Sequence, residues 1–246
     1  MMLRISYLAS LMGVMWFASQ SVLADESDQC QSIAANQLKA EYQISTNQKT
    51  KSLIIWRDNQ QVLQQLPEKK MATYYFKATP TTLQSIRLFD EFQTGIEYQK
   101  NELSNMGKVV ASWEEHSQLI SESFLNQLRL ERVEVTECDT LMHYSGHLKG
   151  HRYQVAWLKK QKLVTYYQDE TDHGSIHIKL INKVNDQAAI ADTFTRYLNY
   201  NMVDFADIGD NENNPFIAKM IRQGFIEHGA SGFYHANGEP ISHNHH

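Results

Sequence analysis

Cysteine, proline and glycine are all scarce in this sequence, with two, four and eleven copies among 246 residues. So few prolines and glycines exclude a low-complexity chain. The two cysteines form no Cys-x-x-Cys pair, which argues against a reactive thiol. The sequence also lacks a glycine-rich phosphate loop, a Gly-x-Ser-x-Gly elbow and an arguable Ser-His-Asp order. A hydrolase is therefore the function with the least support, and the sequence favours a protein that is not an enzyme.

Basic residues are in the minority, with 23 Lys and Arg against 28 Asp and Glu and a formal net charge of −5. Arg4 is the only charged residue among the first 24, so 22 basic and 28 acidic residues follow it, a net charge of −6. Non-specific nucleic-acid binding needs a basic surface that displaces counterions. We therefore expect no nucleic-acid partner.

Long apolar runs are missing except near the N-terminus, where residues 5–18 are almost uninterruptedly hydrophobic. The run follows Arg4 and leads to a small-residue site that ends at Ala24. This order is typical of a secretory signal peptide, and the run is too short to span a bilayer. A retained N-terminal anchor is the alternative, which the site ending at Ala24 disfavours. We expect removal of residues 1–24 and a periplasmic or secreted chain of 222 residues without a membrane span.

Both cysteines, Cys30 and Cys138, lie beyond the expected signal peptide. In an oxidising compartment two cysteines most simply pair, and this bridge would close a loop of more than a hundred residues. The chain-entropy model makes such a loop worth roughly 4 to 5 kcal/mol, although strain commonly reduces the gain. The sequence therefore predicts a disulfide between Cys30 and Cys138.

Short β-rich runs separated by turn signals dominate most of the chain. No long helix interrupts the runs between 51 and 99, so we expect an antiparallel meander there. A short helix over 25–42 and a polar linker over 43–50 precede the meander. Strands return at 132–135 and continue from 141 to 181, where apolar residues occupy alternate positions in three successive strands.

Helical periodicity marks two stretches. A capping box that begins at Ser112, followed by apolar residues at four-residue spacing, predicts an amphipathic helix over 112–130. Apolar residues recur at helical spacing from 186 to 205, and Asn214-Pro215 suits a new helix start, so we expect a helical hairpin over 186–224. An irregular, histidine-containing tail follows over 225–246.

These elements together predict an α+β fold. Its body is a β-rich domain over 25–185, a curved antiparallel sheet that resembles a half-barrel and carries the helix at 112–130. The C-terminal helical hairpin over 186–224 packs on this domain.

Three histidines, His143, His147 and His151, lie in the hairpin that opens the 141–181 stretch. His147 and His151 could bind zinc or copper if their side chains faced each other across the hairpin. Burial selects a different register, which pairs Tyr144 with Val155 and Met142 with Trp157, because a slip by one residue would turn the apolar side chains to the wrong face. His147 and His151 then lie on opposite faces, and a metal site in this hairpin is disfavoured.

Two other groups could bind a divalent metal. The acidic turn over 204–212 offers several oxygen ligands within nine residues, as hard cations require. The tail contains a short histidine-rich tract that suits a soft metal. The candidate ligands are Asp204, Asp207, Asp210, Glu212, His243 and His245. Capping of an inter-helix turn by the acidic residues, and adventitious binding by the tail, are the structural alternatives.

Aromatic residues are frequent in the expected strands. Their faces can form a packed core, or a partly open cavity that accepts an apolar ligand. The face in question contains Tyr144, Tyr153, Val155 and Trp157.

The strands at 155–158, 163–168 and 175–181, after a signal peptide, resemble the half-barrel of the Lol-type lipoprotein carriers and related periplasmic lipid-binding proteins. This resemblance implies that acyl chains or another apolar ligand bind in the concave face, without catalysis.

Two functions follow from these patterns. The first is a non-enzymatic periplasmic binding or accessory protein for a hydrophobic ligand, a lipid or an envelope partner, with no cofactor. The second is a divalent-metal-binding periplasmic protein that uses the acidic turn or the terminal histidines.

If Cys30 and Cys138 pair, replacing either one with serine removes the same bridge. We expect C30S and C138S to lower the melting temperature of the exported protein by the same amount, and the double variant to lower it no further. Differential scanning calorimetry and thiol counting check this expectation. Unequal losses or free thiols in the native protein would contradict it.

Overall fold

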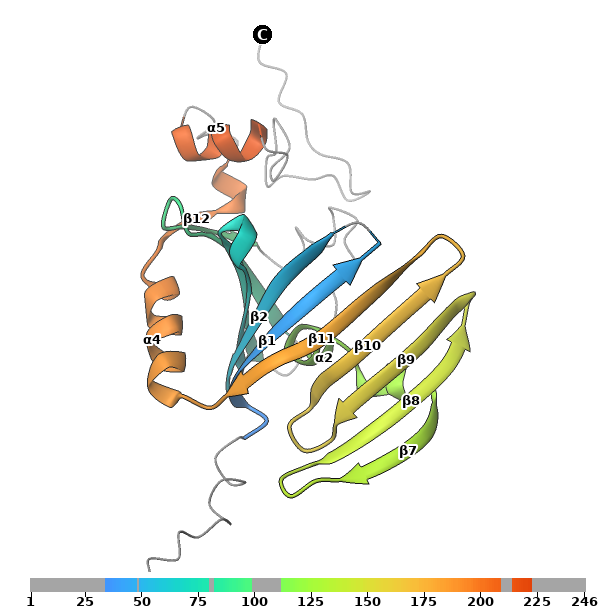
Figure 1. Ribbon diagram of the computed structural model, residues 1–246. Coiled ribbons are helices and arrows are strands. Elements are labelled where there is room, and N and C mark those ends of the chain that lie inside the picture. Colours follow the sequence, from blue (N-terminus) through green and yellow to red (C-terminus); the bar gives the residue numbers. More distant parts are fainter. Residues whose placement is uncertain (1–33, 48, 80–81, 99–111, 209–213, 223–246) are drawn as a thin grey trace, which may run out of the picture.

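The computed structural model describes residues 34–47, 49–79, 82–98, 112–208 and 214–222. Twelve strands in these ranges form one sheet in the order β12-β6-β5-β4-β3-β2-β1-β11-β10-β9-β8-β7. All neighbours are antiparallel except β12 and β6, which pair in parallel. The predicted α+β fold with a curved, half-barrel-like antiparallel sheet is confirmed (Figure 1).

The first half of the chain forms a meander and its flanking strand. Its strands are β1 (Gln37–Thr46), β2 (Thr50–Asp58), β3 (Gln61–Leu66), β4 (Met71–Thr79), β5 (Thr82–Phe89) and β6 (Thr94–Tyr98), with a short 3-10 helix η2 (Pro67–Lys69). The second half adds five antiparallel strands. These are β7 (Arg129–Val135), β8 (Thr140–Leu148), β9 (His151–Leu158), β10 (Leu163–Thr171) and β11 (Gly174–Val184).

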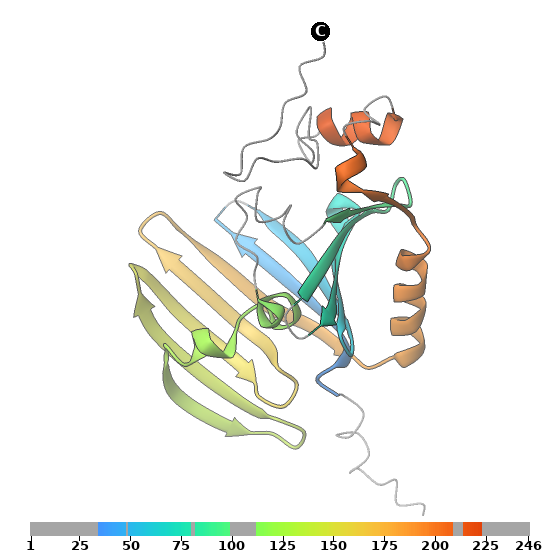
Figure 2. The same ribbon diagram turned by 180° about the vertical axis from the view of Figure 1, so that it is seen from behind.

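Helices cover parts of both faces of the sheet. Helices α2 (Trp113–Gln118) and α3 (Glu122–Leu125) lie within its concave side, whereas α4 (Gln187–Leu198) packs outside, next to β1 and β2 (Figure 2). The chain then forms β12 (Asn201–Asp204), the 3-10 helix η3 (Phe205–Asp207) and α5 (Pro215–Arg222), which lie at one end of the meander. No helix in the described ranges is long and apolar enough to cross a membrane.

The predicted helix over 25–42 is wrong where the structure describes it, because residues 37–42 belong to β1, in the middle of the sheet. Leu38, Ala40 and Tyr42 alternate with polar residues and are almost completely buried. This period of two places them on one face of a strand. The predicted linker over 43–50 is also largely strand, since β1 extends to Thr46.

The continuous helix predicted over 112–130 is broken. Its start is confirmed: the Ser112 hydroxyl accepts from the Glu115 amide, and the Glu115 side chain accepts from the Ser112 amide. Leu119 then adopts a left-handed conformation with φ 72°, and Ser121 caps a second helix, α3. The predicted apolar stripe still points inward, because Ile120 and Leu128 are buried in the concave core.

Both helices of the predicted C-terminal hairpin are present, but the connection between them differs. The first helix was expected to continue to residue 205, whereas α4 ends at Leu198. Residues 201–204 instead extend the sheet as β12, paired with β6. Backbone groups in that segment gain ladder hydrogen bonds, which a loop at the sheet edge would lack. The expected helix start at Asn214 and Pro215 is confirmed, since Asn214 accepts from the Phe216 amide.

Three apolar clusters hold the layers together. The first fills the concave side between the sheet and α2 and α3, the second lies between α5, η3 and β4 to β6, and the third lies under α4. Large buried residues anchor each of them. Examples are Trp157 in the first cluster, Phe216 in the second and Phe194 in the third.

A buried arginine joins both halves of the sheet to α2. Arg57 on β2 is only 3% exposed. Its guanidinium donates to the carbonyl oxygens of Ala35 at 2.9 Å, Ser117 at 2.6 Å, Gln161 at 2.8 Å and Lys162 at 2.7 Å. Burial lowers the pKa of Arg57 to about 10, which leaves the guanidinium charged at neutral pH.

The expected signal peptide over 1–24, the tail over 225–246 and Cys30 lie outside the described residues. Among the residues that are described, no cysteine is free. The bridge between Cys30 and Cys138 stays a prediction.

Replacing Arg57 by methionine keeps most of the side-chain volume but leaves four carbonyl groups without their charged donor. Each buried carbonyl that loses its partner costs about 1 to 3 kcal/mol, so we expect R57M to lower the free energy of unfolding by about 3 kcal/mol or more. Urea denaturation measures the loss. The control is R152M, because Arg152 has a side chain that is 53% exposed and its loss should stay within about 0.5 kcal/mol. Equal losses in both variants would contradict the role of Arg57.

Candidate functional site

The concave face of the sheet has a filled part and an open part. In the filled part, Val155 and Trp157 are 2% and 3% exposed and pack with residues of α2, α3 and the loop after them. In the ranges that the structure describes, no helix extends over the ends of β1, β11, β10 and β9 that lie furthest from α2 (Figure 1). Apolar and aromatic side chains remain accessible there.

Cross-strand registers show which side chains share this open part. One row across the four strands contains Thr46, Ile176, Asp169 and Tyr153. The next row contains Ile44, Ile178, Tyr167 and Val155. Directly opposed residues on neighbouring strands point to the same face, so both rows line the concave side. Except for buried Val155, these residues are partly buried or exposed.

An aromatic contact marks the boundary between the two parts. The ring of Phe124 on α3 meets Tyr153 edge to face, with 5.1 Å between the centroids, and Tyr167 at 6.3 Å. Tyr153 and Tyr167 lie 6.1 Å from each other. The three rings therefore form a wall at which the packed core ends and the open part begins.

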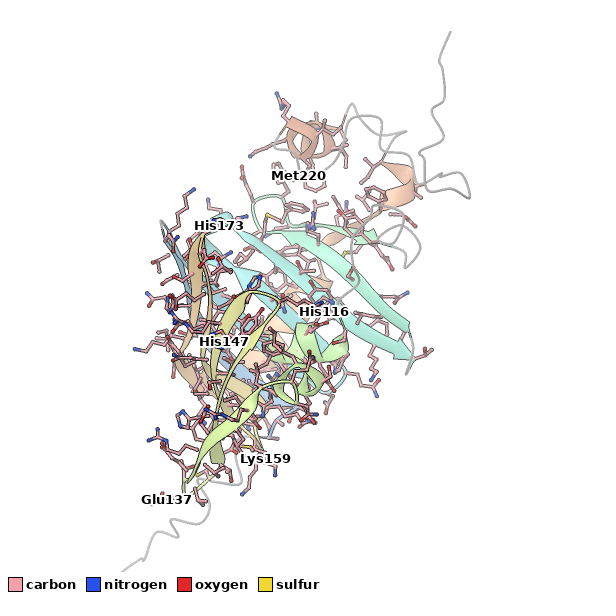
Figure 3. All side chains as sticks on the ribbon, turned by 90° about the vertical axis from the view of Figure 1, so that its right-hand side faces the viewer. His116, Glu137, His147, Lys159, His173 and Met220 are labelled. Carbon is pink, nitrogen blue, oxygen red and sulfur yellow. The ribbon has the colours of Figure 1, made fainter. Side chains whose placement is uncertain are left out.

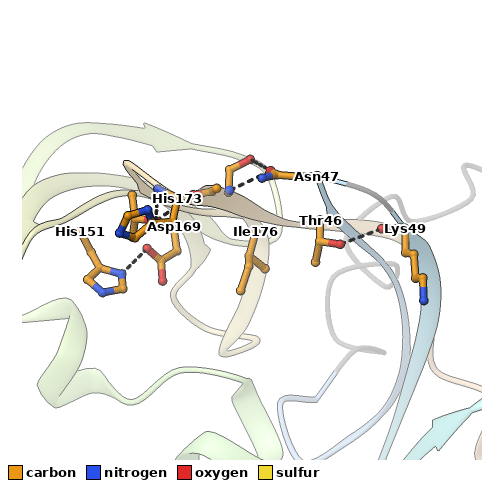
Figure 4. Close-up of a pocket in the computed structure, with 10 residues that line it drawn as sticks. Thr46, Asn47, Lys49, His151, Asp169, His173 and Ile176 are labelled. Carbon is orange, nitrogen blue, oxygen red and sulfur yellow. Dashed lines mark hydrogen bonds and ion pairs between the residues drawn. The ribbon is translucent and has the colours of Figure 1, made fainter.

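A cavity of about 530 Å³ lies beside the first row. Its lining comes from β1, β9, β10, β11 and their connecting turns (Figure 4). The residues are Thr46, Asn47, Lys49, His151, Asp169, Thr171, His173, Gly174, Ser175 and Ile176. Figure 3 places His173 at the end of the sheet opposite Glu137 and Lys159.

A histidine and a carboxylate form a pair in this cavity. His151 Nδ1 lies 2.7 Å from Asp169 Oδ1. The imidazole of His151 stacks on Tyr153 with 5.7 Å between centroids and an interplanar angle of 5°. Gly174 at the start of β11 adopts φ 154° and approaches Asn47, whose side-chain oxygen accepts from the Ser175 amide at 2.9 Å. These polar side chains thus form a rim beside the accessible apolar side chains of the two rows. The latter form an apolar floor that consists of Ile44, Ile176, Ile178, Tyr153 and Tyr167.

Burial raises the pKa of Tyr167, and the negative charge of Asp169 and the neighbouring Tyr153 raise it further. Burial also raises the pKa of Tyr153, with a second contribution from Asp169. Both phenols therefore stay protonated at neutral pH. They can donate hydrogen bonds but have no tendency to act as bases.

The four residues predicted for ligand binding share the concave face but differ in accessibility. Val155 and Trp157 are buried in the filled part, Tyr144 is half-buried beside them, and Tyr153 stacks on His151, which lines the cavity. The hairpin register predicted from burial is confirmed: Tyr144 pairs with Val155 and Met142 with Trp157. Their role in ligand binding stays a prediction.

The predicted metal ligands are only partly described. Asp204 caps η3 by accepting from the Ala206 amide, which is the structural alternative considered for the acidic turn. Asp207 is described, but Asp210, Glu212, His243 and His245 lie outside the described residues. Within the described part, no three His, Cys, Asp or Glu side chains converge on a metal position. Metal binding by the acidic turn or the tail stays a prediction.

Sequence reasoning missed the pairing of His151 with Asp169. The register pairs Asp169 with Tyr153, so His151 lies one row further along the same face, within diagonal reach. In the sequence, each of the two is a polar residue at a position where the alternation of its strand places mostly apolar side chains on the same face. The pairing of β9 with β10 was needed to bring them together.

No family model and no curated protein matches the chain. Among solved structures, MucB in complex with MucA is 12% identical at a TM-score of 0.33, over 68% of this chain and 59% of MucB. A complex of these two proteins is also known from Pseudomonas aeruginosa. LprF from Mycobacterium bovis is 10% identical at a TM-score of 0.30, over 64% of this chain and 92% of LprF.

A DUF1329 family protein from Desulfovibrio piger is 8% identical at a TM-score of 0.29, over 65% of this chain and 90% of its own. The chain thus spans less than two thirds of MucB but most of the other two proteins. The likeness is weak and concerns the fold alone.

Asp169 faces Tyr153 and Tyr167, so its charge should influence both phenols. We expect D169N to lower the pKa of Tyr153 and Tyr167, because removing a nearby negative charge makes the phenolate less unfavourable. A pH titration of ¹³Cζ-labelled tyrosine by NMR measures both values. The control is E170Q, since Glu170 is the next residue on β10 and pairs with Arg152 on the other face. Identical titrations in D169N and the native protein would contradict the geometry.

Proposed function

We propose that this protein is an exported, non-enzymatic binding protein that holds an apolar or amphipathic ligand in the open part of its concave face. The observation that carries the proposal is the group of accessible apolar side chains in the two rows, beside a cavity of about 530 Å³. Cavities of about 300 to 1,000 Å³ are typical of small-molecule sites.

The apolar floor supplies the driving force. Ile176 is 42% exposed, and Ile44, Ile178, Tyr153 and Tyr167 are only partly buried. Covering apolar surface contributes about 25 cal/mol per Å², so a ligand that removes these side chains from water gains affinity without any directed bond. An acyl chain or another flexible hydrocarbon fits such a surface, because a curved sheet imposes no fixed pattern of hydrogen bonds on it.

The polar rim supports a ligand with one polar end. His151, Asp169 and Lys49 line the cavity, and the protonated phenols of Tyr153 and Tyr167 lie nearby. A polar head group at the rim could exchange hydrogen bonds with these side chains while the apolar part lies on the floor. An amphipathic small molecule or a lipid therefore matches the site better than a wholly apolar one.

Export is part of the proposal, and the order of charges and apolar residues over 1–24 supports it. An envelope protein that presents a lipidated or apolar segment is a partner of the same chemistry. The proposal needs no cofactor.

Two measurements test ligand binding directly. Native mass spectrometry of the protein purified from its own compartment should reveal a bound lipid or other amphipathic molecule. Titration with a fluorescent fatty acid should show saturable uptake. A protein that carries no such molecule and takes up no fatty acid would exclude the proposed function.

Ile176 is the residue whose replacement tests the site most cleanly. I176D places a carboxylate on the apolar floor, and we expect it to weaken fatty-acid binding by about tenfold or more, because the charge must lose water when the chain binds. The matched control is I181D on the same strand, since Ile181 is 57% exposed and does not line the cavity. Circular dichroism should show both variants folded. Equal affinities in I176D and I181D would place binding elsewhere.

A further inference from the structure

Strand β7 forms one edge of the sheet and carries three of the most exposed apolar residues of the described chain. Leu130 is 44% exposed, Val133 48% and Val135 84%. They pair with Tyr144, Met142 and Thr140 of β8, so all three share the concave face. An edge strand with an apolar face is a template for pairing with another chain.

The opposite face of β7 carries only charged residues. Arg129, Glu131, Arg132 and Glu134 follow one another in the order positive, negative, positive, negative. Glu131 accepts from Ser145 and Arg129, and Arg132 lies against Glu134 and His143. The register shifts between Leu130 and Arg132, so the bulge turns both Glu131 and Arg132 to the charged face.

The bulge makes residues 129–134 of the strand symmetric about the point between Glu131 and Arg132. From this point toward either end, the strand has a charged residue, an apolar residue and a second charged residue. In both directions the charged residues lie on the charged face and the apolar residue on the concave face. The charges at matching positions are opposite: Glu131 matches Arg132, and Arg129 matches Glu134. A strand with this pattern is complementary to an antiparallel copy of itself.

We propose that β7 is the interface of a two-fold symmetric dimer, in which β7 of a second copy extends the sheet antiparallel. In this register Arg129 faces Glu134 of the second copy, Leu130 faces its Val133, and Glu131 faces its Arg132. Each pair occurs twice because an isologous interface repeats every contact. The concave faces of both copies then lie on the same side of one continuous sheet.

Charged residues and bulges often protect edge strands from pairing. The arrangement on β7 differs from simple protection. Charges of one sign would repel any copy, whereas all four charged residues of β7 find an opposite charge in this one register. Opposite charges directly across two strands contribute about 0.2 to 1 kcal/mol per pair. An interface of one seven-residue strand is small, since stable interfaces bury at least about 1,000 Å². The dimer should therefore be weak and reversible.

Charge reversal at Arg129 and Glu134 tests both the interface and its register. R129E places two carboxylates opposite each other at both ends of its own dimer, and E134R places two guanidinium groups opposite each other there. We expect each variant alone to raise the dissociation constant about tenfold or more. An equimolar mixture removes these like-charge contacts in the heterodimer, where one end pairs the two native residues and the other pairs the two reversed ones. Its dissociation constant should return to within about threefold of the native value. Sedimentation velocity from about 10 μM to about 1 mM measures all of these constants.

The mixing experiment distinguishes a disrupted interface from a folding defect, because two misfolded variants would not regain dimerisation when they are mixed. The control for charge is R152E, which reverses a charge on β9 within the same chain and should leave the dissociation constant unchanged. The control for the apolar face compares V133K, expected to dissociate the dimer, with I181K, expected to have no effect. A native protein that stays monomeric up to about 1 mM, single variants that still dimerise, or a mixture that is not restored would each overturn the proposal.

Discussion

The hydrogen bonds of Arg57 set the arrangement on which the rest of the structure depends. A guanidinium that is removed from water must find acceptors, and this one uses backbone carbonyls from three separate segments: the entry to β1, helix α2 and the turn between β9 and β10. Asp139 holds the same turn from the other side, since its carboxylate accepts from the amides of Lys160 and Gln161. The first and second halves of the sheet and the inner helix are therefore tied at one end.

The hydrogen bonds of Arg57 and Asp139 lie at the opposite end of the sheet from the cavity. Figure 3 shows Lys159, in the turn between β9 and β10, and His173, in the cavity lining, at opposite ends. Arg57 is buried where it meets α2, and apolar side chains become accessible where the helices end. Hydrogen bonds that join the segments at one end and accessible side chains at the other suit a binding surface, because a ligand can be accommodated without disturbing the contacts that hold the sheet together.

Local pattern predicted the sheet well where one face is buried. The register of β8 and β9 followed from keeping Tyr144, Val155 and Trp157 on one side, and the structure has that register. The same rule would have identified β1 from the alternation of Leu38, Ala40 and Tyr42, but polar composition suggested a helix instead. Contacts distant in sequence were beyond reach: β12 joins β6 across more than a hundred residues, and the acceptors of Arg57 are carbonyls that every residue has. The pair of His151 and Asp169 likewise required the fold.

The open part of the concave face exists because the inner helix is broken. An unbroken helix over 112–130 would be about 28 Å long, enough to cross the four strands of the open part at about 4.8 Å spacing. The left-handed conformation of Leu119 ends α2 after six residues, and Ser121 restarts the chain as a four-residue helix in a new direction. Phe124 on that short helix reaches Tyr153 and Tyr167 and no further helix follows before β7. The break between Leu119 and Ser121 thus decides how much of the apolar sheet is core and how much can receive a ligand.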